Sequence, residues 1–325
     1  MAYKVAVIAG TDALAQASSE RVRTELESAG HNVVVVACDS DLTARLRQEH
    51  PDVCYIAAEG RVGRSGAVQS IADLLEIPCV GADATVCKAT WSKDALATTL
   101  AEAAVRGDFD ARMPYSECLS TACFVELGAA AALDLLERRI PGGYPLVVQP
   151  ARGSASRIVA NAEELGEAIH AALGLDDEVI VREWVEGVHL TVGILGDADD
   201  LQVLPPVEVV RNDRVVLDEE RGIGRTTTDY FAPVRLDSLS TELEQAQAIR
   251  NEIERTALDA YFACGCRDLA TIDLVWDGAR ARVLGVDTAP TLGAGDIVPL
   301  ACEAANIALA DVLDALVAIA VERGC

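Results

Sequence analysis

Residues 265–290, GCRDLATIDLVWDGARARVLGVDTAP, contain the strongest structural signal in the chain. Two apolar segments, Leu269–Trp276 and Ala281–Val286, flank the pair Asp277-Gly278. An Asp-Gly pair between two such segments is typical of a β-hairpin, because these residues tolerate the backbone angles of a tight turn. The sequence therefore predicts two antiparallel strands near the C-terminus.

The N-terminal part has a different pattern. Val5–Ala9, Val33–Ala37 and Val53–Ala57 are short continuous apolar runs, as expected for parallel strands that are buried on both faces. Ala13–Ala29 is predicted to form a helix that ends at Gly30. This alternation predicts a β-α-β-α-β unit with a parallel sheet. No G-x-G-x-x-G dinucleotide motif follows the first strand.

The middle of the chain predicts a small α+β unit. Tyr144–Val159 has the pattern of a strand, a Gly/Ser turn and a second strand, and Glu163–Leu173 that of a helix. Glu178–Val185 is a further predicted strand. Longer helices are predicted between Ser240 and Tyr261 and over Ala301–Arg323.

The composition excludes several classes of protein. The 325 residues contain 27 Lys and Arg against 52 Asp and Glu, a formal net charge of −25. Such a surface repels phosphate backbones and anionic lipids, so we expect neither nucleic-acid nor membrane binding. No segment has the pattern of a signal peptide or a membrane span, so a cytoplasmic location is expected. The ten cysteines are then expected to be reduced thiols.

Several phrases, taken in chain order, resemble the D-alanine–D-alanine ligase family of ATP-grasp enzymes. Ile77-Pro-Cys-Val-Gly81 is similar to the family's Ile-Pro-Tyr-x-Gly, and Leu146–Arg152 is similar to its Val-x-Lys-Pro-x-Arg. Val179–Gly187 resembles its strand and adenine-binding hinge. The other matching phrases are residues 59–66, 91–94, 191–197, 204–209, 229–233, 265–273 and 283–290.

The resemblance implies an α/β fold in which a Rossmann-like N-terminal parallel-sheet domain precedes an ATP-grasp fold of two α+β subdomains. Residues 1–90 are then expected to form the N-terminal domain that precedes the ATP-grasp fold. Residues 91–180 are expected to form the small central subdomain, and residues 181–325 the C-terminal subdomain. Members of this family commonly form homodimers, so a homodimer is expected as well.

The activity implied by the resemblance is ATP-dependent joining of a carboxylate to an amine in peptidoglycan precursor synthesis. ATP phosphorylates the carboxylate of one D-alanine, and the amine of a second D-alanine attacks the acyl phosphate. This chemistry needs cations around the phosphates, carboxylates that hold Mg²⁺ and donors that stabilise the tetrahedral intermediate. ATP, Mg²⁺ and a small amino-acid substrate are therefore the expected ligands.

Some residues that match the family's pattern keep the groups that this chemistry needs. Lys93 is the candidate phosphate ligand. The backbone of Glu183, Trp184 and Val185 is the candidate adenine-binding hinge, because backbone groups do not depend on side-chain identity. The candidate metal ligands are Asp273 and Asp287. In the simpler interpretations, Lys93 is a solvated lysine and the two carboxylates serve only in caps and turns.

Other positions depart from the family's pattern where its chemistry needs charge. Gln149 stands where the family has a phosphate-binding lysine, Thr271 where it has a catalytic arginine, and Gly285 where it has a metal-bridging glutamate. Loss of one transition-state donor typically lowers a rate by about 10²–10³-fold. We therefore expect impaired or altered ligase activity.

Further substitutions allow other ligand contacts. Arg64 lies where an acidic pair is usual, and Arg64 and Arg152 together are a candidate anion site. His189 stands where the family has a ribose-binding glutamate and is a candidate replacement ligand or base. The Gly- and Thr-rich residues 218–229 predict a mobile loop that covers the site.

Three functions stay open at this point. The first is a ligase of the D-alanine–D-alanine class with slow or altered chemistry. The second is a non-catalytic ATP-grasp paralogue with a regulatory or binding role. The third is an ATP-grasp ligase for a different amino acid or acid.

Overall fold

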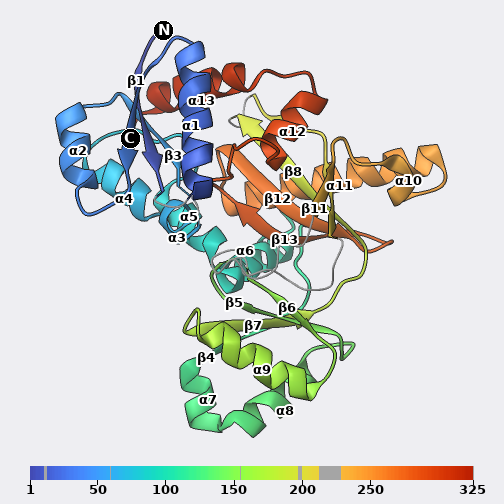
Figure 1. The fold of residues 1–325 in the computed structure, drawn as a ribbon. Helices are drawn as coiled ribbons and strands as arrows, with labels where there is room; N and C mark the ends of the chain where they lie inside the picture. The colour runs from blue at the N-terminus through green and yellow to red at the C-terminus, as the bar shows by residue number, and fades with distance from the viewer. Residues whose placement is uncertain (11–12, 59, 154, 197–199, 212–227, 325) are drawn as a thin grey trace.

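The computed structural model describes most of the chain, and the described residues form three β-sheets (Figure 1). The first sheet is the predicted parallel one, with strand order β2-β1-β3. Its strands are β1 (Lys4–Ala9), β2 (Asn32–Ala37) and β3 (Val53–Ala57), connected through α1 (Ala13–Ser28) and α2 (Leu42–Glu49). The described ranges are 1–10, 13–58, 60–153, 155–196, 200–211 and 228–324.

One prediction for this sheet is wrong. Strands β1 and β3 are almost entirely buried, as expected, but β2 is an edge strand in which Val35 is 47% exposed. The outer edge of β2 is uncovered, whereas the outer edge of β3 is covered through the bridge between Cys54 and Cys79, so the apolar residues of β2 are less enclosed. The apolar run 33–37 therefore predicted the strand correctly and its burial incorrectly.

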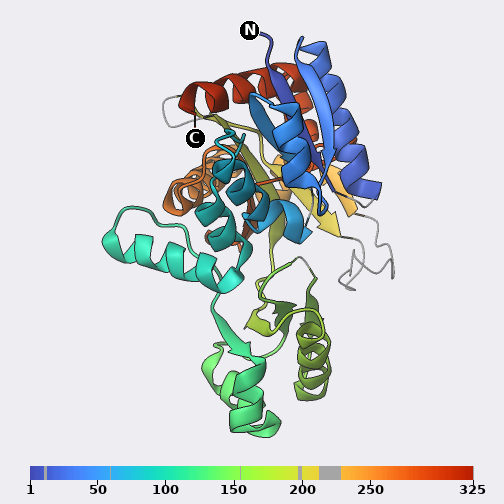
Figure 2. The same ribbon diagram turned by 90° about the vertical axis from the view of Figure 1, so that its left-hand side faces the viewer.

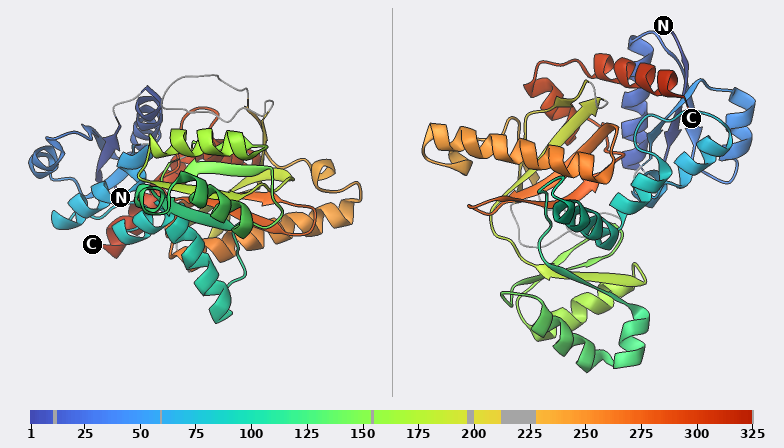
Figure 3. Two further views of the ribbon diagram at one scale, coloured as in Figure 1. Left: turned by 90° about the horizontal axis from the view of Figure 1, so that it is seen from below. Right: turned by 180° about the vertical axis from the view of Figure 1, so that it is seen from behind.

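The central sheet is antiparallel, with strand order β11-β10-β8-β12-β13 and with β9 paired to β8. The predicted hairpin is confirmed, because Trp276 lies opposite Ala281 and Gly278 adopts a φ of +91° between them. Helix α11 (Leu243–Cys264) covers one face of this sheet (Figure 3, right). The strands are β8 (Val188–Gly196), β9 (Gln202–Val203), β10 (Val207–Arg211), β11 (Thr228–Phe231), β12 (Asp268–Trp276) and β13 (Ala281–Asp287).

The third sheet is small and antiparallel, with order β4-β7-β5-β6, and it projects from the rest of the molecule (Figure 2). Its apolar face packs against helices through Leu146, Val148, Val179 and Val181. Because side chains alternate along a strand, Gln149 and Arg182 lie on the opposite face. The elements are β4 (Ser116–Ser120), α7 (Thr121–Leu127), α8 (Ala129–Arg139), β5 (Leu146–Pro150), β6 (Arg157–Val159), α9 (Ala162–Leu173) and β7 (Glu178–Glu183).

Helices connect the parallel sheet to the small sheet. The short helix α3 (Gly60–Arg64) is followed by α4 (Ala67–Leu74). Next come α5 (Ala84–Trp91) and α6 (Lys93–Arg106), which are separated only by Ser92. The second one begins at Lys93 because the Ser92 hydroxyl accepts a hydrogen bond from the Ala95 amide, which is an N-terminal cap.

The helix predicted over Ala301–Arg323 is instead two helices, α12 (Ile297–Ala304) and α13 (Leu309–Arg323), which meet at 111°. A further short helix, α10 (Leu236–Leu239), precedes α11. No single helix in the described ranges is apolar and long enough to cross a membrane, although α12 and α13 together meet that test of length and composition. In this fold the apolar residues of both helices belong to the core shared by the first and central sheets.

A buried ion pair fixes the N-terminal unit against the central sheet. Asp268, the first residue of β12, is fully buried. Its carboxylate pairs with the Arg323 guanidinium at the end of α13, with N–O distances of 2.6 and 2.7 Å. The same carboxylate accepts a hydrogen bond from the Gly81 amide at 2.7 Å. The contact therefore joins β12, α13 and the segment that follows the parallel sheet.

Removal of one partner of this pair tests its importance. In Arg323→Gln, Asp268 stays buried without its cation, so we expect the free energy of unfolding to fall by about 3–5 kcal/mol. Arg138→Gln is the matched control, because Arg138 and its partner Asp134 are 75% and 57% exposed and such pairs contribute about 0–1 kcal/mol. Urea denaturation followed by tryptophan fluorescence measures both variants. Equal, small losses would contradict the assignment.

Candidate functional site

The central sheet brings the predicted site residues onto one face. Thr271 lies opposite Asp287 in the β12–β13 ladder, and Asp273 lies opposite Gly285. Asp273 also lies opposite Thr191 of β8. Because directly opposed residues point to the same side of a sheet, these five residues form one surface. We call it the carboxylate face.

Asp273 is held from the side of β8. The Thr191 hydroxyl donates a hydrogen bond to Asp273 Oδ1 at 2.7 Å. Part of the Asp273 side chain is exposed, but much of the space around its carboxylate is filled by protein. This loss of water contact raises the pKa of Asp273 above its usual range. The hydrogen bond from Thr191 opposes that shift, because it favours the charged carboxylate.

Asp287 already has a cationic partner. Arg64 Nε lies 3.0 Å from Asp287 Oδ1, and the same oxygen accepts a hydrogen bond from the Ala289 amide at 3.0 Å. Arg64 Nη2 also donates to the Val286 carbonyl at 3.2 Å. Its guanidinium lies over the Trp91 ring, 5.0 Å from the centroid. Arg64 is therefore fixed by an ion pair, a backbone hydrogen bond and a cation–π contact.

Lys93 lies beside Gly285. A Cβ atom added to Gly285 would be 3.3 Å from Lys93 Nζ and 3.6 Å from Asp273 Oδ2. The lysine is placed there by the start of α6, where its amide donates to the Ala151 carbonyl at 2.9 Å. Burial, which is the largest cause, and the positive charge of Arg64 together lower the Lys93 pKa to about 8, against the opposing effect of the two aspartates.

The small sheet contributes a second set of residues. Arg182 of β7 is close enough that its charge also lowers the Lys93 pKa. Gln149 of β5 lies on the same face of the small sheet as Arg182 and is 7% exposed. The structure therefore turns this face toward Lys93. Gln149 provides no positive charge there.

The hinge begins at Glu183, the last residue of β7, and continues through Trp184 and Val185 toward β8, where the chain passes from the small sheet to the central sheet. Glu183 is held by Arg282 Nη1 at 3.0 Å from its Oε1 atom. The Trp184 ring lies 6.0 Å from the His189 ring, and Val185 is buried. That the backbone of Glu183, Trp184 and Val185 binds adenine stays a prediction. A ligand role for His189 also stays a prediction.

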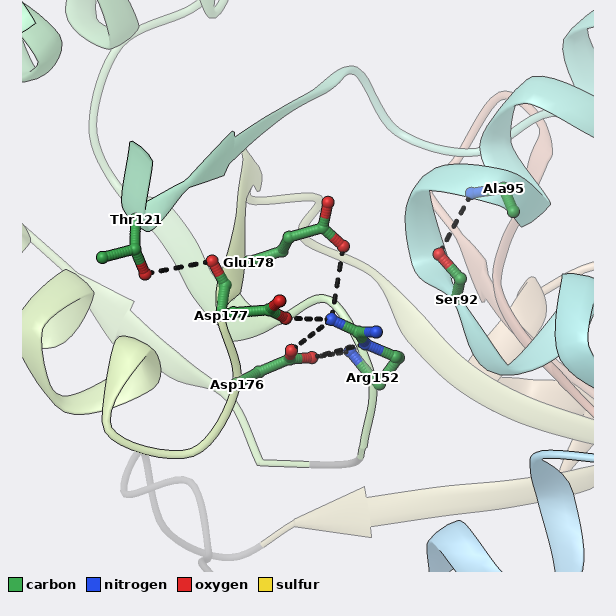
Figure 4. A network of polar contacts seen from close by, with 7 residues as sticks. All are labelled: Ser92, Ala95, Thr121, Arg152, Asp176, Asp177 and Glu178. Carbon is green, nitrogen blue, oxygen red and sulfur yellow. Dashed lines mark hydrogen bonds and ion pairs between the residues drawn. The ribbon is translucent and has the colours of Figure 1, made fainter. Parts of the chain in front are cut away.

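The proposed anion site at Arg64 and Arg152 is not formed. Arg152 Nε lies 3.0 Å from Asp176 Oδ2, and its guanidinium also contacts Asp177 and Glu178 (Figure 4). Arg64 is paired with Asp287. The two arginines therefore pair with different carboxylates and form no joint anion site. The predicted loop over residues 218–229 lies outside the described residues except for its last two positions.

The sequence did not reveal every contact of this site. The pairing of Arg64 with Asp287 joins α3 to β13, and only the packed N-terminal unit brings them together. The bond from Thr191 to Asp273 depends on the pairing of β8 with β12. No feature of the β8 sequence indicates which strand pairs with it.

The chain has an α/β unit with a parallel sheet, followed by two antiparallel sheets that are joined by a hinge. A lysine at the start of a helix lies near both antiparallel sheets. This is the architecture of an ATP-grasp protein. The crystal structure of D-alanine–D-alanine ligase from Bacillus anthracis superposes with a TM-score of 0.77 at 20% identity, covering 99% of this chain and 98% of that one. VanG D-Ala:D-Ser ligase from Enterococcus faecalis gives 0.77 at 20% identity, over 98% and 99% of the two chains. At this identity the likeness shows the fold.

Sequence similarity identifies the family. The model for the D-ala D-ala ligase C-terminus matches residues 134–318. The D-alanine–D-alanine ligase of Alcanivorax borkumensis is 30% identical over 277 residues, which cover 84% of this chain and 78% of that protein. That of Desulforudis audaxviator is 29% identical over 310 residues, or 94% and 93% of the two chains. The chain belongs to the D-alanine–D-alanine ligase family.

The residues present do not fit the Mg²⁺ ion that the family resemblance implies. Mg²⁺ requires several oxygen ligands in a near-octahedral arrangement. Asp287 Oδ1 is taken by Arg64 and the Ala289 amide, and Gly285 provides no carboxylate. No cluster of three or more Asp, Glu, His or Cys side chains suited to a metal occurs among the residues that the structure describes. Asp273 and Asp287 as metal ligands stay a prediction.

The environment of Lys93 can be measured directly, because Lys4, Lys88 and Lys93 are the only lysines in the sequence. We expect Lys93 to titrate near pH 8 in NMR spectra of the protein with ¹³C-methylated lysines. In Asp273→Asn its pKa should fall further, because the lost negative charge favoured the ammonium. The resonances of Lys4 and Lys88 in the same spectrum give the comparison. A Lys93 pKa near 10.4, the value of an unperturbed lysine, would contradict the site geometry.

Proposed function

We propose that this chain is an ATP-grasp protein of the D-alanine–D-alanine ligase type whose ligation chemistry is impaired. The observation that carries the proposal is the make-up of the carboxylate face. Where the family resemblance implies an arginine and a glutamate, this face holds Thr271 and Gly285. Neither side chain carries a charge, so Thr271 cannot neutralise a reacting carboxylate as an arginine does, and Gly285 cannot bridge metal ions as a glutamate does.

The facing sheet supports the same proposal. Gln149 replaces a lysine that the resemblance implies as a phosphate ligand, and it retains only a neutral amide. Lys93 is the phosphate ligand that we propose for ATP, with adenine at the backbone of Glu183, Trp184 and Val185. A crystal structure of the Bacillus anthracis ligase with ATP supports nucleotide binding in this fold. An amino-acid substrate, a homodimer and a cytoplasmic location are further proposals from the resemblance.

Binding without chemistry is the second candidate function. It is favoured by the ion pair between Arg64 and Asp287, because a carboxylate held by an arginine and a backbone amide is withdrawn from ligand exchange. In this case the chain binds a nucleotide and acts through that bound state. The two candidates differ in whether any D-alanine-dependent turnover occurs.

Phosphate release from ATP tests the proposal. With Mg²⁺ present, we expect D-alanine to stimulate release at least about 10³-fold less than in the Desulforudis audaxviator ligase measured in parallel, because more than one charged group is missing. Restoring charge in the double variant Gln149→Lys/Thr271→Arg should raise the stimulated rate. The control Gln149→Met/Thr271→Leu adds bulk without charge and should not. Turnover of the unmodified protein at the rate of its relative would overturn the proposal, and complete absence of stimulation favours the second candidate.

A further inference from the structure

We propose that Arg64 and Lys93 take the place of a divalent cation on the carboxylate face, so that a nucleoside triphosphate binds here without metal. The inference rests on the nucleotide binding proposed above and specifies its charge requirement. It starts from two positions on the carboxylate face. At one, the Arg64 guanidinium pairs with Asp287. At the other, the Lys93 ammonium lies beside Gly285, where the family resemblance implies a glutamate.

Arg64 occupies the first position. Its Nε and Nη2 groups bond to Asp287 and to the Val286 carbonyl, and its flat face lies on Trp91. The Arg64 side chain is 17% exposed and that of Asp287 is 23% exposed, so water screens the pair only in part. A guanidinium has five N–H donors, and these two bonds use two of them. Arg64 can thus neutralise Asp287 and still donate to a phosphate oxygen.

Lys93 occupies the second position. Its ammonium lies where any side chain at residue 285 would begin, 3.3 Å from the Cβ site. A carboxylate that bridged metal ions from this strand position would have to displace it. The backbone bond from Lys93 to Ala151 fixes the base of the side chain at the start of α6. The ammonium therefore lies near the Asp273 carboxylate, in the region that a metal would need.

The balance of charge then favours an anion over a metal ion. Among the described residues, the charges of Arg64 and Lys93 balance those of Asp273 and Asp287. The two carboxylates therefore leave no net negative charge to hold Mg²⁺. Two cations that can donate to phosphate oxygens favour an anionic ligand, most strongly where protein replaces water.

Calorimetric titration with ATP tests the ligand half of the proposal. We expect the Kd in excess EDTA to agree with that in excess Mg²⁺ within about twofold. Lys93→Gln should weaken binding in EDTA by about tenfold or more, the loss typical of a charge-assisted contact. Lys88→Gln, at an exposed lysine on α5, is the matched control and should change little.

Two results would overturn this half. One is binding that requires Mg²⁺, and the other is no binding of ATP under either condition. The second result would leave impaired ligation intact, because that proposal is judged by D-alanine-stimulated phosphate release. The two proposals therefore fail separately.

Electron paramagnetic resonance of Mn²⁺ with the nucleotide-free protein tests the metal half. We expect no bound Mn²⁺ signal for the unmodified chain. The triple variant Arg64→Ser/Lys93→Gln/Gly285→Glu releases Asp287, removes the ammonium and adds a carboxylate beside Asp273, so it should bind Mn²⁺ at least about tenfold more tightly. Arg61→Ser, at an exposed arginine of the same short helix, is the control and should not. Equal Mn²⁺ binding by the unmodified chain and the triple variant would overturn the proposal.

Discussion

The ion pair between Arg64 and Asp287 is the contact on which the character of this site depends. Arg64 belongs to a five-residue helix beside the parallel sheet, and Asp287 is the last residue of the hairpin strand β13. The two meet only because the N-terminal unit is packed on the central sheet. The buried pair of Asp268 and Arg323 supports that packing from the same end of the hairpin. Fold and electrostatics are thus coupled at one place.

The chain keeps the architecture of its family but differs from the family pattern in the charges of this site. The fold is that of the D-alanine–D-alanine ligase family, with the facing sheets and the lysine at the start of α6. On the carboxylate face, however, positive charge comes from side chains of the chain itself. Mg²⁺ would bring two positive charges directly to the oxygens of a transferring phosphoryl group, whereas Arg64 brings one charge that Asp287 already shares. A site of this kind suits binding better than phosphoryl transfer.

The sequence predicted the local features and missed the distant contacts. The hairpin around Asp277 and Gly278 follows from neighbouring residues, and so does the placement of Gly285 and Asp287 on one side of a strand. The partner of Asp287 does not, because α3 and β13 are far apart in the chain. Residues 116–139 were not predicted as β4, α7 and α8, since α7 has no buried residue and so lacks a clear apolar periodicity. The break at Ser92 is a capping effect that apolar periodicity cannot detect.

Anomalous diffraction from crystals grown with ATP and Mn²⁺ tests most directly whether the chain supplies its own cations. With data collected at the manganese absorption edge, we expect nucleotide density near Lys93 and no anomalous peak between Asp273 and Asp287. Arg64 should still contact Asp287. A manganese peak coordinated by both carboxylates, with Arg64 displaced, would contradict the central claim.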